Sequence, residues 1–208
     1  MEKKEATIIT VSNLKGGVGK SFLTTLFASS LHQQGKKVLV IDADDLQQSI
    51  LMVRNRDIEN GKTEQELFQV LPSNSSSAVD YLQNVIYDFD FIFIDLPGNF
   101  KQKGVLDCIT QSDYIFIPTS LSDEDLDSTI AYLNILFKDI VPKRKELNLE
   151  TKLFGVLYTV TKNSIEYKNF IENKENYPIE FWESVVPFSE KLKRFNSTSG
   201  VDAYNTKT

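Results

Sequence analysis

The chain has 208 residues, 41% of them hydrophobic and 25% charged, which is typical of one soluble globular domain with a core of its own. No apolar stretch approaches the roughly 20 residues that cross a bilayer, and the single cysteine, Cys108, excludes an intrachain disulfide and a multi-cysteine metal site. The net charge of −6 disfavours a nucleic-acid partner. We therefore predict one domain over residues 1–208, located in the cytoplasm and not attached to a membrane.

Short apolar runs, rich in β-branched and aromatic residues, recur along the chain and are predicted to form parallel strands buried on both faces. They are Thr7–Val11, Val38–Ile41, Phe91–Ile94, Tyr114–Ile117 and Leu153–Val160. Helical patterns lie between them, one over Ser21–Gln34 that ends at Gly35 and one that begins after Ser122 and runs to about Lys138. This alternation predicts an α/β fold, a doubly wound and mostly parallel sheet with helices on both faces.

Two polar stretches are less informative. Residues 54–66 carry no clear period, and Ser73–Ser77 is predicted to be a loop that leads into a helix.

A glycine-rich turn follows the first predicted strand and precedes the first predicted helix, the context that a phosphate-binding loop requires. Glycines let backbone N–H groups converge on an anion, and the helix N-terminus adds positive charge. We expect Lys20 to reach the β- and γ-phosphates and the Ser21 hydroxyl to bind Mg²⁺. The candidate loop residues are Lys15, Gly16, Gly17, Val18, Gly19, Lys20 and Ser21.

The loop departs from the standard pattern, because Leu14 stands where the first glycine would be and Lys15 follows it. This deviant sequence resembles the ParA/MinD family of P-loop ATPases. The resemblance implies an ATP- and Mg²⁺-dependent ATPase and a nucleotide-bridged homodimer, in which Lys15 reaches the partner's nucleotide. It also extends the expected nucleotide site to Phe22 and to Pro187, at a turn that would flank the adenine. The alternative for Lys15 is a solvated loop lysine.

Acidic residues end two of the predicted strands. Asp42 and Asp44 follow the second strand on one face, and Asp95 ends the strand Phe91–Ile94. The family resemblance implies that Asp44 orients the attacking water, that Asp42 supports the magnesium region and that Asp95 holds Mg²⁺ through water. Asp44 would otherwise be a structural acid. The sequence departs from the family after Asp44, where Asp45 and Leu46 stand in place of Pro-Gln.

Two later segments are weaker candidates. Pro118 and Asp125 resemble a family segment that contacts the nucleotide edge and the dimer partner, but Asp123, Glu124, Asp125 and Asp127 are also favourable acids in the first turn of a helix. Trp182 is expected to pack in the core or to stack on adenine.

The expected partners follow from the resemblance and from two basic clusters, Lys143–Lys145 and the group Lys191, Lys193 and Arg194. Residues 1–138 have 12 basic and 19 acidic residues, a net −7, whereas residues 139–208 have 11 and 10, a net +1. We expect non-specific DNA binding and a ParB-like partner, with hydrolysis as the switch in partitioning. Alternatively the clusters are solvated helix faces. The remaining alternatives are a positioning ATPase with a protein cargo and a metabolic P-loop enzyme that phosphorylates or ligates a small molecule.

Overall fold

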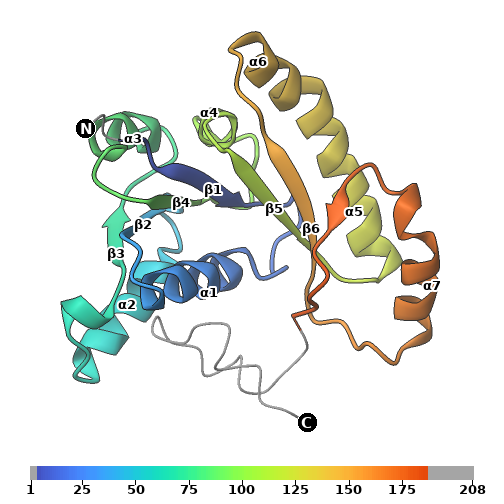
Figure 1. Cartoon of the computed structure of the whole chain (residues 1–208), viewed down its shortest axis with the longest axis horizontal. Coiled ribbons are helices and arrows are strands. Elements are labelled where there is room, and N and C mark those ends of the chain that lie inside the picture. The colour runs from blue at the N-terminus through green and yellow to red at the C-terminus, as the bar shows by residue number, and fades with distance from the viewer. Residues whose placement is uncertain (1–3, 187–208) are drawn as a thin grey trace.

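A seven-stranded parallel sheet forms the centre of the molecule (Figure 1). The computed structural model describes residues 4–186. The strand order is β3-β2-β4-β1-β5-β6-β7. The strands are β1 (Thr7–Val11), β2 (Val38–Asp42), β3 (Gln69–Pro72), β4 (Phe91–Asp95), β5 (Tyr114–Thr119), β6 (Lys152–Leu157) and β7 (Glu180–Phe181). All pairs are parallel, which confirms the predicted fold class.

Helices cover both faces of the sheet, as the continuous apolar strands require. On one face, α1 (Lys20–Gln33) and α2 (Ser49–Glu59) pack their apolar residues against the central strands. On the other face lie α3 (Ala78–Val85), α4 (Val105–Thr110), α5 (Asp123–Ile135) and α6 (Val141–Glu146). The helix α7 (Ile165–Asn173) lies beside the β7 edge of the sheet (Figure 1). No helix among residues 4–186 is long and apolar enough to span a membrane.

The order of the strands reverses at β1, which lies between β4 and β5: β2, β3 and β4 are on one side of β1, and β5, β6 and β7 are on the other. In an open parallel sheet, ligands bind at the carboxyl ends of the strands where the order reverses in this way. The turns after β1, β2 and β4 therefore meet at the binding edge of the sheet, and the predicted motifs follow those three strands.

Most predicted elements are confirmed. Gly35, at φ 79°, ends α1 in the left-handed conformation, and the Ser122 hydroxyl accepts a hydrogen bond from the Asp125 N–H at the start of α5. The helical segment after Ser122 continues further than Lys138, through a π-helical turn at Leu136–Ile140 and into α6. Pro142 lies in the first turn of α6 and has no N–H to donate, which accounts for an irregular turn at this place.

Candidate phosphate-binding site

The turn between β1 and α1 has the backbone of an anion cradle. Gly17 and Gly19 are in the left-handed region at φ 75° and 86°, and Gly19 caps α1 without any side-chain cap. A Cβ at Gly19 would lie 2.7 Å from the Tyr158 ring, and one at Gly16 would meet only open space. The loop therefore needs glycine at position 19, and it leaves the first N–H groups of α1 free for an anion.

Lys20 bridges the loop and the turn after β4. Its Nζ donates a hydrogen bond to the Lys15 carbonyl at 3.0 Å, and a Cβ at Gly98 would lie 3.5 Å from the same atom. Burial lowers the pKa of Lys20, and the carboxylates of Asp95 and Asp44 oppose that shift. The structure thus holds a partly buried cation at the mouth of the loop, where a phosphate would neutralise it.

Asp95 is fully buried at the carboxyl end of β4. The Thr24 hydroxyl donates to its Oδ1 at 3.5 Å, its carboxylate also interacts with Ser21, and its Oδ2 has no partner. Burial raises the pKa of Asp95 to about 7, and the neighbouring Asp42 carboxylate adds to that shift. A carboxylate oxygen kept buried and without a partner is costly, and a cation beside it would relieve that cost.

Asp42 lies directly opposite Asp95 in the β2 and β4 register. The backbone N–H of Leu51, near the start of α2, donates to Asp42 Oδ2 at 3.0 Å, while Oδ1 has no partner. Burial raises the pKa of this carboxyl, and the charge of Asp44 raises it further. Asp42 therefore joins β2 to α2 and adds negative charge beside Asp95.

Asp44 is 9% exposed, and its Oδ1 accepts a hydrogen bond from the Gln47 N–H at 3.1 Å. The residues after Asp44, where the sequence departs from the family pattern, form a surface turn. Leu46 is 85% exposed, Asp45 accepts a hydrogen bond from the Gln102 side chain at 3.3 Å, and Gln48 takes a left-handed φ of 43°. Because the turn projects outward, Asp44 stays within the electrostatic range of Lys20 and Asp95.

Lys15 forms ion pairs with acidic residues of its own chain. Lys15 Nζ pairs with Asp125 and lies 3.2 Å from Glu124 Oε1, both in the first turn of α5. Pairing with Asp125 raises the pKa of Lys15, and the same pair helps to lower the pKa of Asp125. Asn13, two residues before Lys15, links this part of the loop to the end of β5 by donating a hydrogen bond to the Pro118 carbonyl at 2.8 Å. The sequence pointed to Lys15 and Asp125 separately, but it gave no sign that they meet.

These residues fit a magnesium ion that keeps most of its waters better than a metal ion that is held entirely by protein side chains. In the described part of the chain, no group of three or more His, Cys, Asp or Glu side chains is placed to hold a metal together. Mg²⁺ usually keeps several waters and uses one or two protein carboxylates with substrate phosphates. The unpartnered oxygens of Asp95 and Asp42, with the Ser21 hydroxyl, match that limited demand.

Three further predicted residues have other surroundings. Val18 is buried, and the Phe22 ring packs 5.8 Å from the Tyr158 ring, so both side chains serve packing and only their backbone groups can face a nucleotide. Pro187 lies outside the described residues. Cys108 is buried in the core, and burial raises the pKa of its thiol to about 12.

One predicted basic cluster is not a continuous surface patch. Arg144 is 2% exposed, and its guanidinium donates to the Thr110 carbonyl, the Asp113 carboxylate and the Glu150 carbonyl at 2.7 to 2.9 Å. Arg144 therefore joins α6 to the segments before β5 and β6. It is neither a DNA contact nor a solvated helix face. Lys191, Lys193 and Arg194 lie outside the described residues.

Known proteins resemble this chain in sequence. Residues 9–199 match the family described as CobQ/CobB/MinD/ParA nucleotide binding domain. The chain is 30% identical to the maintenance of carboxysome distribution protein A of Halothiobacillus neapolitanus, over 61% of this chain and 56% of that protein.

Two solved structures have a similar fold. The chain superposes on a plasmid partition protein of Borrelia burgdorferi with a TM-score of 0.63, 21% identity and coverage of 94% and 97% of the two chains. For cobyrinic acid a,c-diamide synthase of Mycobacterium smegmatis, with a bound ATP analogue and magnesium, the TM-score is 0.66, the identity 17% and the coverage 96% and 94%.

Proposed function

Because this chain belongs to the CobQ/CobB/MinD/ParA nucleotide-binding domain family, we propose that it is a magnesium-dependent ATPase that works as a nucleotide-controlled switch. The observation that carries the proposal is the convergence of Lys20, Ser21 and Asp95 at the carboxyl edge of the sheet. Buried carboxylates beside a partly buried lysine are poorly compensated without a ligand, and a triphosphate with Mg²⁺ would supply the missing charges.

Each residue then has a separate task. The loop backbone from Gly16 to Gly19 and the first turn of α1 hold the phosphates, and Lys20 neutralises the charge on the β- and γ-phosphates. Ser21 and Asp95 hold Mg²⁺, with Asp42 adding negative charge nearby. Asp44, which is oriented by the Gln47 N–H, positions the attacking water. Phosphoryl transfer asks for this positioning and charge neutralisation rather than for covalent catalysis.

Dimerisation is the proposed output of ATP binding. Lys15 pairs with Asp125 and Glu124 in its own chain, so its ammonium must leave these carboxylates before it can reach a partner's nucleotide. The charged oxygens of a triphosphate accept charge-assisted hydrogen bonds from an ammonium group, so the nucleotide competes with the two carboxylates for Lys15. We therefore expect Lys15 to exchange partners when the ATP-bound dimer closes.

The cargo separates three versions of this switch. The likeness to a plasmid partition protein favours DNA and a ParB-like partner, with Lys191, Lys193 and Arg194 as the remaining candidate DNA contacts. The relative named for carboxysome distribution favours a protein cargo. The likeness to a diamide synthase is the observation that favours a metabolic enzyme. We place DNA partitioning first.

The test uses Asp44→Ala, which should bind ATP but not hydrolyse it. With ATP and Mg²⁺ we expect a stable dimer in solution that retains DNA at low salt and releases it as salt is raised. Asp45→Ala is the matched control, because Asp45 is exposed on the surface turn and its carboxylate accepts a hydrogen bond from the Gln102 side chain. A monomeric Asp44→Ala protein that ignores DNA would contradict the switch.

The alternatives give different results in the same assay. A dimer that never binds DNA at any salt concentration favours a protein cargo. ATP turnover that rises with a small metabolite, but not with DNA or a partner protein, favours the metabolic enzyme.

A further inference from the structure

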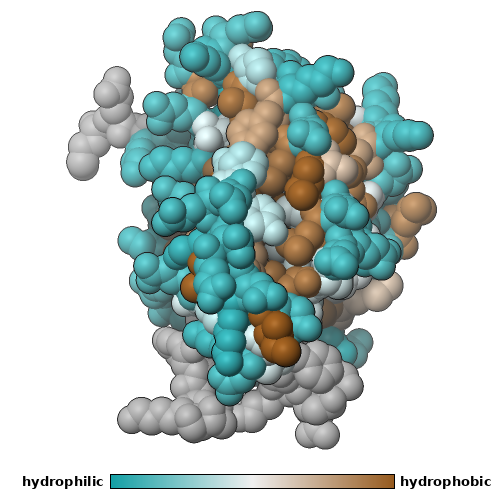
Figure 2. All heavy atoms as spheres, turned by 90° about the vertical axis from the view of Figure 1, so that its right-hand side faces the viewer, coloured by the Kyte–Doolittle hydropathy of each residue, from teal (hydrophilic) through white to brown (hydrophobic). Residues whose placement is uncertain are grey.

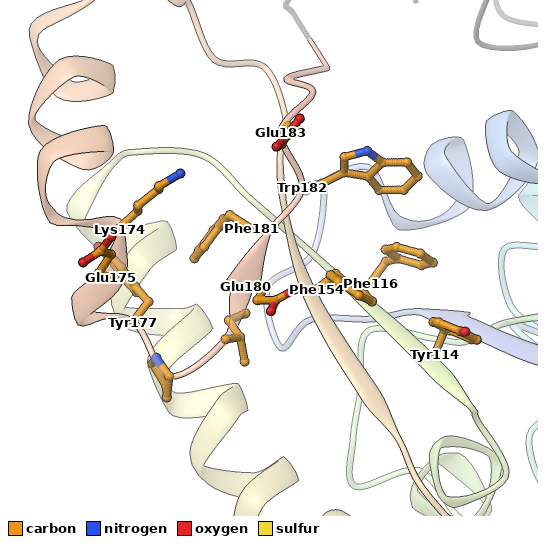
Figure 3. Close-up of a pocket in the computed structure, with 12 residues that line it drawn as sticks. Tyr114, Phe116, Phe154, Lys174, Glu175, Tyr177, Glu180, Phe181, Trp182 and Glu183 are labelled. Carbon is orange, nitrogen blue, oxygen red and sulfur yellow. The ribbon is translucent and has the colours of Figure 1, made fainter.

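A groove lined with aromatic side chains lies on the half of the sheet formed by β5, β6 and β7 (Figure 3). Its volume is about 850 Å³. Its apolar wall is a row of rings in contact: Trp182 lies 5.3 Å from Phe116, Phe116 lies 5.8 Å from Phe154, and Phe154 lies 6.4 Å from Tyr114. This row runs across β5 and β6 on the face that carries α1, because Trp182 also stacks on Phe27 of α1 at 5.4 Å.

The row is not covered in the described part of the chain. Trp182 is 43% exposed, and Tyr114, Phe116 and Phe154 are only partly buried. On the opposite face the same strands bury Ile115 and Ile117 under α5 and the π-helical turn. Hydrophobic side chains are also exposed among hydrophilic ones on the side of the molecule that carries α7 (Figure 2). Aromatic area of this extent gains free energy when it is covered.

The rim of the groove is acidic. Glu175, Glu180 and Glu183 line it, against Lys174 as the cation among the lining residues. All three glutamates are exposed, and Figure 3 shows Glu180 and Glu183 on the segment that carries Trp182. A ligand for this groove should therefore be apolar on one side and basic at its margin.

The chain supplies such a segment next to the groove. Val186, the last described residue, bridges to Tyr158 and donates to the Leu157 carbonyl at 2.8 Å. The 22 residues that follow contain Phe188, Leu192 and Phe195, spaced four and three apart, which on a helix would share one face. Between them stand Lys191, Lys193 and Arg194, with Glu190 as the one acid, so residues 188–195 have a net charge of 3 − 1 = +2.

We propose that residues 188–195 dock in this groove, with Phe188, Leu192 and Phe195 on the aromatic wall and the basic side chains against the glutamate rim. The dimensions agree. Eight residues span about 12 Å as a helix, and β6 covers about 13 Å from Phe154 to Tyr158 as a strand. The groove is therefore long enough for this segment, and the link through Val186 gives the segment a high effective concentration at the groove.

The docking would also affect the proposed DNA binding. Lys191, Lys193 and Arg194 are also the remaining candidate DNA contacts, so the glutamate rim and DNA compete for the same cations. This part of the inference rests on the proposed function, whereas the docking itself does not.

Trp182 makes a direct test possible, because it is the single tryptophan of the chain. The experiment measures acrylamide quenching of Trp182 fluorescence in the full chain without nucleotide and compares Leu192→Ser/Phe195→Ser with the unchanged protein. We expect the double variant to be quenched about twofold more strongly and its emission to shift to the red, because the indole loses its apolar cover. The matched control is Ile165→Ser on α7, a side chain that is 73% exposed and remote from the groove wall.

A second variant tests the charges. Glu180→Lys/Glu183→Lys should raise quenching as the first variant does, and adding Lys191→Glu/Lys193→Glu should restore the original value. Equal quenching in the unchanged protein and Leu192→Ser/Phe195→Ser would overturn the proposal. A protection of Trp182 that is lost on dilution would also overturn it, because the occupant would then be a second copy. Neither result depends on ATP, so failure here leaves the proposed ATPase untouched.

Discussion

The two halves of the sheet differ in what holds them in place. Around β1, β2 and β4, buried polar groups crowd one edge, and the carboxylates of Asp42 and Asp95 face each other with unpartnered oxygens. Beyond β5 the sheet carries a partly exposed aromatic row and ends in the short strand β7. The first half is built at a cost in stability that a ligand offsets. The second half is stabilised by packing, and its aromatic row leaves exposed area that further packing would cover.

The first prediction tests whether the second half of the sheet depends on one buried ion. Arg144→Ala removes three hydrogen bonds and leaves Asp113 without its guanidinium partner, so we expect the free energy of unfolding to fall by about 3 kcal/mol or more. Lys145→Ala, next to it and exposed, should change stability little. Urea unfolding of the nucleotide-free proteins measures both. Equal stabilities would show that Arg144 does not join these segments.

The next prediction concerns the first half of the sheet and the stability that its buried carboxylates cost. The pKa of Asp95 is raised from 3.8 to about 7 in the folded chain, so the folded state binds a proton more tightly than the unfolded state does. The resulting stabilisation is complete below about pH 4 and is lost as pH rises to about 7, by up to about 4 kcal/mol. Asp95→Asn does not titrate at this position.

The measurement is the difference in the free energy of unfolding between the unchanged nucleotide-free protein and Asp95→Asn at several pH values. We expect the stability of the unchanged protein to fall relative to that of the variant as pH rises from 4 to 7. A difference that stays constant, or that changes in the opposite sense, would contradict the assigned protonation of Asp95. Asp45→Asn, exposed on the surface turn, serves as the control.

A smaller effect should appear in nucleotide affinity. Lys20→Ala removes the cation at the mouth of the loop, and the loss of charge-assisted hydrogen bonds to phosphate should weaken ATP binding about 10- to 100-fold. Lys36→Ala, an exposed lysine beyond α1, should leave affinity unchanged. Titration calorimetry with ATP and Mg²⁺ measures both variants. An unaltered affinity in Lys20→Ala would place the phosphates elsewhere.

The sequence predicted the first half better than the second. The strands β1, β2 and β4 are continuous apolar runs, and the glycines and acids that follow them have few alternatives at the edge of a parallel sheet. The strands β3 and β7 were missed, because Gln69–Pro72 and Glu180–Phe181 are short and carry polar residues at the two sheet edges. The helix α2 was also missed, since Arg54 and Asp57 are buried within it and break the apolar period.

Contacts between distant segments were the other gap. The pairing of Lys15 with Asp125 joins residues 110 positions apart, and the burial of Arg144 depends on carbonyl groups at the end of α4 and in the segment before β6. Neither follows from local spacing, because a charged residue has the same sequence pattern whether it faces water or a buried partner.

The central claim is that bound ATP joins two copies of this chain and that Lys15 crosses between them. The most direct measurement compares the mass in solution of Asp44→Ala with that of Asp44→Ala/Lys15→Gln, both with ATP and Mg²⁺. We expect the first protein to be a dimer and the second to bind ATP through Lys20 but remain a monomer. If the second protein binds ATP and dimerises as fully as the first, Lys15 does not bridge the two copies and the account is wrong.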